Sequence, residues 1–147
     1  TGVSQTSDDY QLPQRSLDLK GLRIVVVDDN VDTLNLLAFI LEQYGVEVKA
    51  VASATEALEA IAQTQPDLLL SDIAMPEMNG YMLIRQVRAL EGASGKTLPA
   101  IALTAFAAET DHNKIISAGF QTHLTKPVEP AELAVAIANL CRRNSHN

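Results

Sequence analysis

Short, mostly β-branched apolar runs alternate with longer segments of helical period from residue 21 onward. The first run, at 24–27, is apolar at every position, which is typical of a central parallel strand covered on both faces. Strands that alternate with helical segments predict an α/β chain with a parallel sheet and right-handed crossovers. The predicted strands span 23–28, 46–50, 67–71, 100–104 and 121–125.

Five helical segments lie between or after these strands. Ser53 and Glu56 form a capping box at the start of the second segment, and Gly45 and Gly119 are suited to end the first and the fourth. Pro130 falls in the first turn of the fifth segment, where proline is tolerated. The predicted helices span 31–44, 53–65, 80–90, 107–118 and about 130–143.

The chain has 147 residues, of which 47% are hydrophobic, and a formal net charge of −7. This size suits one soluble domain with a single core. Residues 1–20 are polar without apolar periodicity, so we expect a linker at 1–20, the folded domain at 21–143 and a polar tail at 144–147. Because the sequence begins with Thr1 and shows no signal peptide, we interpret it as an excerpt from a longer chain.

Composition excludes several classes of protein. No apolar run approaches the ~20 residues needed to cross a bilayer, so no membrane span or membrane contact is expected. The acidic balance and the scattered Lys and Arg residues argue against nucleic-acid binding. A single cysteine, Cys141, excludes an internal disulfide and a cysteine-based zinc site, so a reducing cytoplasmic setting is expected.

Polar residues stand at the carboxyl ends of four predicted strands: Asp28 and Asp29, Asp72, Thr104, and Lys126. One acidic residue after a strand is most often a helix cap or a turn residue. Four strand ends together predict a site, because ligands of parallel sheets bind at the carboxyl ends of the strands.

The charges at this edge indicate the chemistry of the site. Carboxylates ~4 Å apart repel by ~4 kcal/mol at a surface-like dielectric, so three of them together need a cation. Oxygen ligands with room for water favour Mg²⁺, Lys126 adds a second positive charge, and Thr104 offers a hydroxyl donor. Attack by an Asp oxygen on an activated phosphoryl group fits this set.

These residues resemble the receiver domain of two-component response regulators, over about residues 22–142. The resemblance implies a flavodoxin-like fold, a doubly wound five-stranded parallel sheet of order 2-1-3-4-5 with five helices. The motifs that carry it are Val-Val-Asp28-Asp29, Ser71-Asp72-Ile-Ala-Met75-Pro76-Glu-Met78-Asn-Gly80, Leu103-Thr104-Ala105 and Lys126-Pro127.

The resemblance implies that Asp72 is the phosphoacceptor and takes its phosphoryl group from a phosphohistidine. Asp29, Asp72 and the main-chain carbonyl of Ala74 would bind Mg²⁺, and Asp28 would hold a metal-bound water. Thr104 would contact a phosphoryl oxygen. Lys126 would pair with Asp72 before transfer and with the phosphate after it.

The resemblance also implies a switch, in which Thr104 moves toward the phosphate and an aromatic side chain turns inward. His123 occupies that aromatic position, where Tyr or Phe is more usual; the alternative is that His123 sits at a strand end without switching. The switched surface would be helix four, strand five and helix five. Structural roles are expected for Met75, Pro76 and Gly80 in the loop after Asp72, and for Pro127 after a cis peptide bond.

Two positions depart from many relatives. Ala74 and Phe106, two residues beyond Asp72 and Thr104, are apolar where polar residues can orient an attacking water. We therefore expect slow self-dephosphorylation.

Three rival interpretations stay open. A dinucleotide-binding domain needs a Gly-rich turn where this chain has Asp28-Asp29-Asn30. A haloacid-dehalogenase-type phosphatase needs an Asp at the position of Ala74 and its acidic pair late in the chain. A degenerate receiver that serves only as a docking module would not need the full Asp, Thr and Lys set. The preferred interpretation is not an enzyme but a phosphoacceptor that assists its own phosphorylation and dephosphorylation.

The polar linker followed by Asp28-Asp29-Asn30 resembles receivers fused behind the kinase core of hybrid sensor histidine kinases. A stand-alone or effector-linked regulator is the alternative parent. The expected partner is a histidine kinase or a histidine phosphotransfer protein, in the same chain or a separate one, and dimerisation stays open.

Overall fold

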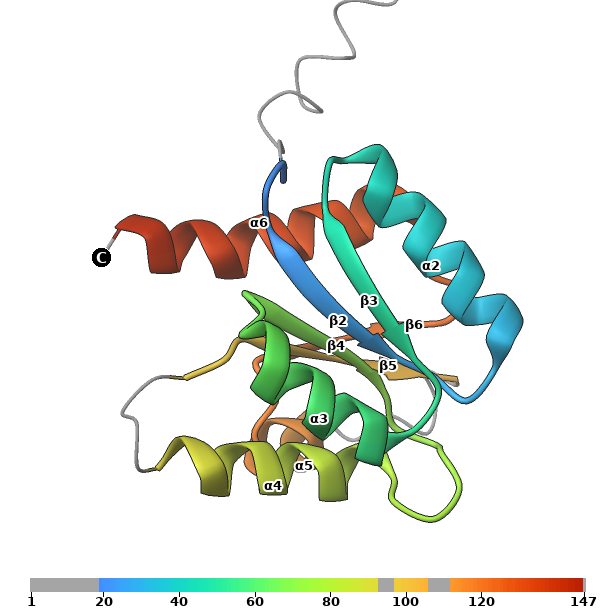
Figure 1. The fold of residues 1–147 in the computed structure, drawn as a ribbon, viewed down its shortest axis with the longest axis vertical. Helices are drawn as coiled ribbons and strands as arrows, with labels where there is room; N and C mark the ends of the chain where they lie inside the picture. The colour runs from blue at the N-terminus through green and yellow to red at the C-terminus, as the bar shows by residue number, and fades with distance from the viewer. Residues whose placement is uncertain (1–18, 93–96, 106–111, 147) are drawn as a thin grey trace, which may run out of the picture.

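The computed structural model describes residues 19–92, 97–105 and 112–146, with the backbone alone at 142–146. One parallel sheet runs through the centre in the order β3-β2-β4-β5-β6 (Figure 1). In chain order this is 2-1-3-4-5, so the predicted doubly wound fold is confirmed. The strands are β2 (Arg23–Val27), β3 (Glu47–Val51), β4 (Leu68–Asp72), β5 (Ala100–Thr104) and β6 (Thr122–Thr125).

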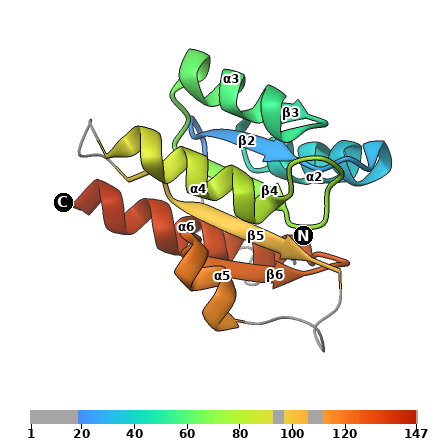
Figure 2. The ribbon, with the colours of Figure 1, turned by 90° about the horizontal axis from the view of Figure 1, so that it is seen from below.

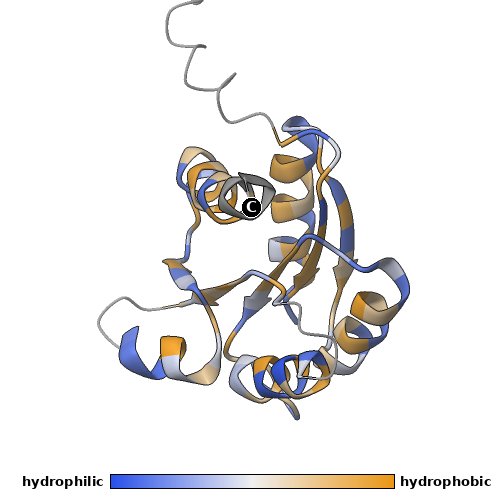
Figure 3. Cartoon of the chain, turned by 90° about the vertical axis from the view of Figure 1, so that its left-hand side faces the viewer, coloured by the Kyte–Doolittle hydropathy of each residue, from blue (hydrophilic) through white to orange (hydrophobic). Residues whose placement is uncertain are grey.

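The five helices cover both faces of the sheet (Figures 1 and 2). One face carries α2 and α6, and the opposite face carries α3, α4 and α5. Figure 3 shows these layers, with largely hydrophobic strands between helices of mixed hydropathy. The helices are α2 (Val31–Gln43), α3 (Ala54–Thr64), α4 (Gly80–Glu91), α5 (His112–Ala118) and α6 (Pro130–His146).

The sheet divides the hydrophobic core into two clusters, where the sequence suggested a single core. Ile24 and Val26 belong to the first core, which packs against α2 and α6. Val25 and Val27 belong to the second core, which packs against α3, α4 and α5. Because side chains alternate along a strand, a strand buried on both faces has to be apolar at every position.

Local sequence signals set the helix ends. The side chain of Asn30 caps α2 by accepting the Thr33 N–H at 3.0 Å. Ser53 caps α3 by accepting the Glu56 N–H at 3.2 Å, while the Glu56 carboxylate accepts the N–H of Ala52 at 3.1 Å. These side chains satisfy amide groups that a helix N-terminus leaves without partners.

The ends of the domain differ from the expected boundaries. Leu19, assigned to the linker by its sequence, is 2% exposed and packs in the first core. Helix α6 continues to His146, through positions expected to form a polar tail. The predicted helix at 107–118 is described only as α5 from His112, since 106–111 lie outside the described residues.

Within the described part of the chain, no helix is both long enough and apolar enough to span a membrane.

Candidate acidic site at the carboxyl ends of the strands

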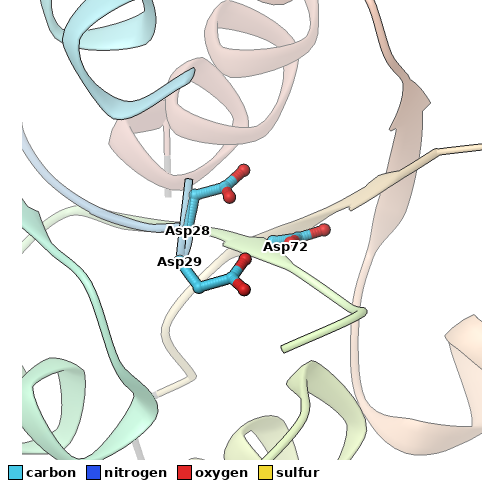
Figure 4. A group of neighbouring side chains, drawn as sticks. All are labelled: Asp28, Asp29 and Asp72. Atoms are coloured by element: carbon cyan, nitrogen blue, oxygen red, sulfur yellow. The ribbon is translucent and has the colours of Figure 1, made fainter. Parts of the chain in front are cut away.

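Three carboxylates meet where β2 and β4 end. Asp28 and Asp29 directly follow β2, and Asp72 is the last residue of β4, which pairs with β2 through Val27 and Ser71. One oxygen from each carboxylate lies within 4.8 Å of those of the other two. Their carboxyl groups extend to the same side of the strand ends (Figure 4). The parallel register therefore brings together acidic residues that are more than forty positions apart.

Two of these carboxylates are buried. Asp28 is 0% exposed and Asp72 is 3% exposed, whereas Asp29 is exposed. Asp28 Oδ1 accepts the backbone N–H of Asn30 at 2.9 Å, and Asp28 Oδ2 accepts a hydrogen bond from Lys126 Nζ at 2.8 Å. Buried charges require such partners, and the buried Asp28 carboxylate has them. The side of the site at Asp29 is open to solvent.

Lys126 reaches this site from the loop after β6. Its Nζ lies 2.8 Å from Asp28 Oδ2 and 3.3 Å from Asp72 Oδ1. The resemblance implied a pair with Asp72, but the shorter contact is with the fully buried Asp28. The Lys126 N–H donates to Thr104 O at 2.7 Å, and the peptide bond between Lys126 and Pro127 is cis.

Burial and charge act on the two ionisable groups in different ways. Burial and the neighbouring charge of Asp28 raise the pKa of Asp72, while Lys126 and a backbone hydrogen bond from Ala74 partly oppose this shift. Burial alone would lower the pKa of Lys126. The hydrogen bond to Asp28 and the charges of Asp72 and Asp28 outweigh burial, so the Lys126 pKa is raised and the ammonium is maintained.

The donor set fits a divalent cation. Three carboxylates against one ammonium leave a formal charge of −3 + 1 = −2 in the cluster when all are ionised. Hard oxygen donors with one side open to water are the surroundings that Mg²⁺ prefers, because it keeps several water ligands. The exposed Asp29 and the two buried carboxylates could hold such an ion.

The loop after Asp72 approaches the strand end closely at Gly80. The Gly80 N–H donates to Ile73 O at 2.9 Å, and a Cβ at this position would lie 2.5 Å from Asp72 O. Only glycine allows this approach. Met75 is buried in the second core, whereas Ala74 and Pro76 are exposed.

Thr104 and His123 lie on the two strands beyond Asp72. Thr104 ends β5, one residue after Leu103, the register partner of Asp72, and it is 8% exposed. His123 is partly buried on β6 opposite Ala102. Phe106, predicted to affect the lifetime of a phosphorylated state, lies outside the described residues.

Sequence reasoning missed two features around the site. Asn30 both caps α2 and donates its N–H to Asp28, and the Asp-x-Asn spacing before a helix is the signal that could have indicated this turn. The second feature is the pairing of Lys126 with Asp28, 98 positions away, for which the sequence holds no local signal.

A family model for the response regulator receiver domain matches residues 24–138. The chain is 48% identical over 123 residues to an uncharacterized 14.6 kDa protein in the sodA1 3′ region of Leptolyngbya boryana, covering 84% of this chain and 92% of that protein. It is 36% identical to the sensor histidine kinase GacS of Pseudomonas protegens over 85% of this chain, which spans only 14% of that kinase.

Two solved structures share the fold. A putative response regulator from Chloroflexus aurantiacus is 35% identical, with a TM-score of 0.77 over 84% of this chain and 100% of its own. The receiver domain of the histidine kinase CKI1 from Arabidopsis thaliana, solved in complex with Mg²⁺, is 30% identical, with a TM-score of 0.75 over 84% of this chain and 94% of its own.

Proposed function

Since the chain belongs to the response regulator receiver domain family of two-component signalling, we propose that it accepts a phosphoryl group from a phosphohistidine onto Asp72. The observation that carries the proposal is the acidic cluster itself. Asp72 is a nearly buried carboxylate at a strand end, within reach of Asp28, Asp29 and the Lys126 ammonium.

In the proposed transfer, an Asp72 carboxylate oxygen attacks the phosphorus of the donor. The new P–O bond forms as the P–N bond breaks, and the imidazole leaves with the electron pair of that bond. Lys126, 3.3 Å from Asp72, neutralises charge on the phosphoryl oxygens, and the Thr104 hydroxyl donates to one of them.

Asp29, Asp72, the main-chain carbonyl of Ala74 and, through water, Asp28 are the groups that would hold Mg²⁺. When bound, this ion supplies the positive charge that lets an anionic carboxylate approach an anionic phosphoryl group. The Mg²⁺ complex of the CKI1 receiver domain supports this assignment.

We further propose that Thr104 and His123 transmit the modified state to the surface of α5, β6 and α6. Their place on the two strands beyond Asp72 supports this role. The partner would be a histidine kinase or a histidine phosphotransfer protein.

Two parent architectures have support. The likeness to the sensor histidine kinase GacS, of which the chain spans 14%, supports a receiver within a hybrid histidine kinase. The Leptolyngbya boryana protein, 92% covered by this chain, favours a single-domain regulator as the second candidate.

The test is the intact mass of the protein after incubation with acetyl phosphate and Mg²⁺. We expect the wild-type chain to gain one phosphoryl group and Asp72→Asn to gain none. Asp32→Asn, an exposed change on α2, is the matched control and should gain the group. A wild-type chain that gains nothing, or an Asp72→Asn chain that is still modified, contradicts the proposed phosphoacceptor.

Ala74 carries a prediction about the lifetime of the phosphorylated state. The residue is exposed and apolar, so its side chain cannot orient a water for attack on phospho-Asp72. We expect Ala74→Asn to accelerate loss of the phosphoryl group, measured by mass after removal of the donor. Equal decay rates in the two proteins would contradict this expectation.

A further inference from the structure

Two histidines lie together outside the acidic site. His112 is the first residue of α5 and is exposed, and His123 lies on β6 and is partly buried. Their ring centroids are 5.5 Å apart and the ring planes are inclined at 59°. This pairing joins residues of two different elements.

The Nδ1 atom of His123 indicates that the pair could bind a ligand. Among the described residues, it is the one buried side-chain nitrogen or oxygen atom without a hydrogen-bond partner. Buried polar groups are satisfied in the great majority of native proteins, and one that is not calls for a role such as the binding of a water or an ion. The ring of His112, with its centroid 5.5 Å from that of His123, is a second imidazole beside this ring.

The ring spacing suits two imidazoles that share one metal ion. With metal–nitrogen bonds of about 2.0–2.1 Å, two histidines on a tetrahedral ion have ring centres about 5 Å apart. Imidazole nitrogen favours Zn²⁺, Ni²⁺ and Cu²⁺, whereas Mg²⁺ prefers oxygen. The histidine pair therefore offers nitrogen donors to a cation, whereas the acidic cluster offers oxygen donors.

We propose that His112 and His123 form a binding site for a transition-metal dication, with Zn²⁺ as the probe. Water would complete the coordination of the ion from the side of His112, which is exposed. A bound ion would connect the start of α5 to β6, so it would stabilise the folded state. This proposal goes beyond the proposed phosphoacceptor function and does not rest on it.

The test is calorimetric titration of the full chain with ZnCl₂ in a buffer that contains Mg²⁺. We expect one Zn²⁺ ion per chain, and an affinity at least ten-fold weaker in His112→Asn and in His123→Phe. His123→Phe keeps a ring of similar size, and His112→Asn changes an exposed side chain, so neither variant is expected to unfold. The matched control is His146→Asn, which removes the third histidine of the chain and should bind as the wild type does.

A second measurement locates the ion. In NMR spectra, the ring signals of His112 and His123 should both shift on addition of ZnCl₂, while those of His146 should not. Binding that is unchanged in both pair variants, or that is lost in His146→Asn, overturns the proposal. Such a failure leaves the phosphorylation of Asp72 unaffected, so the two proposals can be judged separately.

Discussion

Asp72 is a nearly buried carboxylate whose charged neighbours are two other carboxylates, Asp28 and Asp29, and the Lys126 ammonium. Its raised pKa means that the folded state favours the neutral acid more than the unfolded state does. The ionised form therefore reduces the free energy of unfolding at neutral pH, and a positive charge placed in the cluster restores it.

This leads to a prediction for Asp72→Asn. In a chelating buffer at pH 7, removal of the charge relieves the cost of burying it and the repulsion from Asp28, so we expect the free energy of unfolding to rise by about 1 kcal/mol. Added Mg²⁺ should stabilise the wild type and leave the variant nearly unchanged. Urea unfolding with and without Mg²⁺ measures both effects, and a variant less stable than the wild type in chelator would contradict the prediction.

Gly80 supports a second prediction at the level of one residue. An added methyl group would collide with the main-chain carbonyl of Asp72, so Gly80→Ala should lower the free energy of unfolding by about 1–3 kcal/mol. It should also slow phosphorylation by acetyl phosphate, because the strand end that carries Asp72 has to shift.

Gly92→Ala is the matched control for Gly80→Ala. Gly92 has a right-handed helical conformation at the end of α4, and an added Cβ would come no closer than 3.4 Å to the nearest atom. It should leave stability the same or slightly higher. Equal losses in the two variants would show that the approach to Asp72 is not the cause.

Single residues divide into those that the sequence could indicate and those that it could not. Asp28, Asp29 and Asp72 follow apolar strands, so parallel pairing places them at one edge. Neither the preference of Lys126 for Asp28 nor the contact of His112 with His123 has a sequence signal, because both depend on how distant loops pack.

Between elements, Arg88 is the main polar connection on the α4 side of the sheet. Its guanidinium donates to Gly119 O at 3.0 and 2.7 Å, to Glu91 Oε1 at 2.8 Å and to Gln121 Oε1 at 3.2 Å. Glu91 and Gln121 in turn accept the N–H groups of Leu98 and Ala100. The side chain thus joins the end of α4 to the start of β5 and to the turn between α5 and β6.

We predict that Arg88→Met lowers the free energy of unfolding by about 1–3 kcal/mol. The change removes the guanidinium that donates to the Gly119 carbonyl and to Oε1 of the partly buried Glu91 carboxylate. Arg85→Met, an exposed change on the same helix, is the control and should have little effect. Urea denaturation compares the two, and similar losses in both would argue against the network.

Most element types followed from periodicity, and the errors lie at the ends. Several observed strand ends differ by one residue from the predicted ends. The hydrogen bonds between strands stop where the neighbouring strand stops, and this sets the observed end. Leu19 joins the core although a polar segment precedes it, since one apolar residue carries no periodic signal. Helix α6 continues to His146 because residues 144–146 lack a helix-breaking glycine or proline.

At the scale of the whole molecule, two hydrophobic cores share one sheet. Leu37 lies in the first core and Ile84 in the second, and both are almost fully buried. Both cores pack against the same strands, so separation of these strands would expose both cores to water. The domain is therefore expected to unfold in one cooperative step.

We predict that Leu37→Ala and Ile84→Ala each lower the free energy of unfolding by about 2–5 kcal/mol. Far-UV circular dichroism and amide hydrogen exchange of the central strands should report the same loss in each variant. Leu36→Ala, at a neighbouring position that is 54% exposed, is the control and should change stability by less than about 0.5 kcal/mol. A loss of protection from hydrogen exchange that is confined to the elements around one core would contradict a single cooperative unit.

The order of the whole sheet was predictable through the resemblance, because the motifs specify a family with one topology. The separation of the core into two clusters also follows from the sequence in retrospect. Four consecutive apolar residues in β2 cannot all face one side of a sheet.

The ion pair between Lys126 and Asp28 has a consequence for how the protein is made. These residues are 98 positions apart, so the two buried carboxylates are synthesised long before their ammonium partner. While the chain emerges from the ribosome, strands β2 to β6 are synthesised before Lys126, so the acidic residues at first lack their lysine partner. Translation therefore has to proceed past β6 before the acidic cluster acquires its native balance of charge.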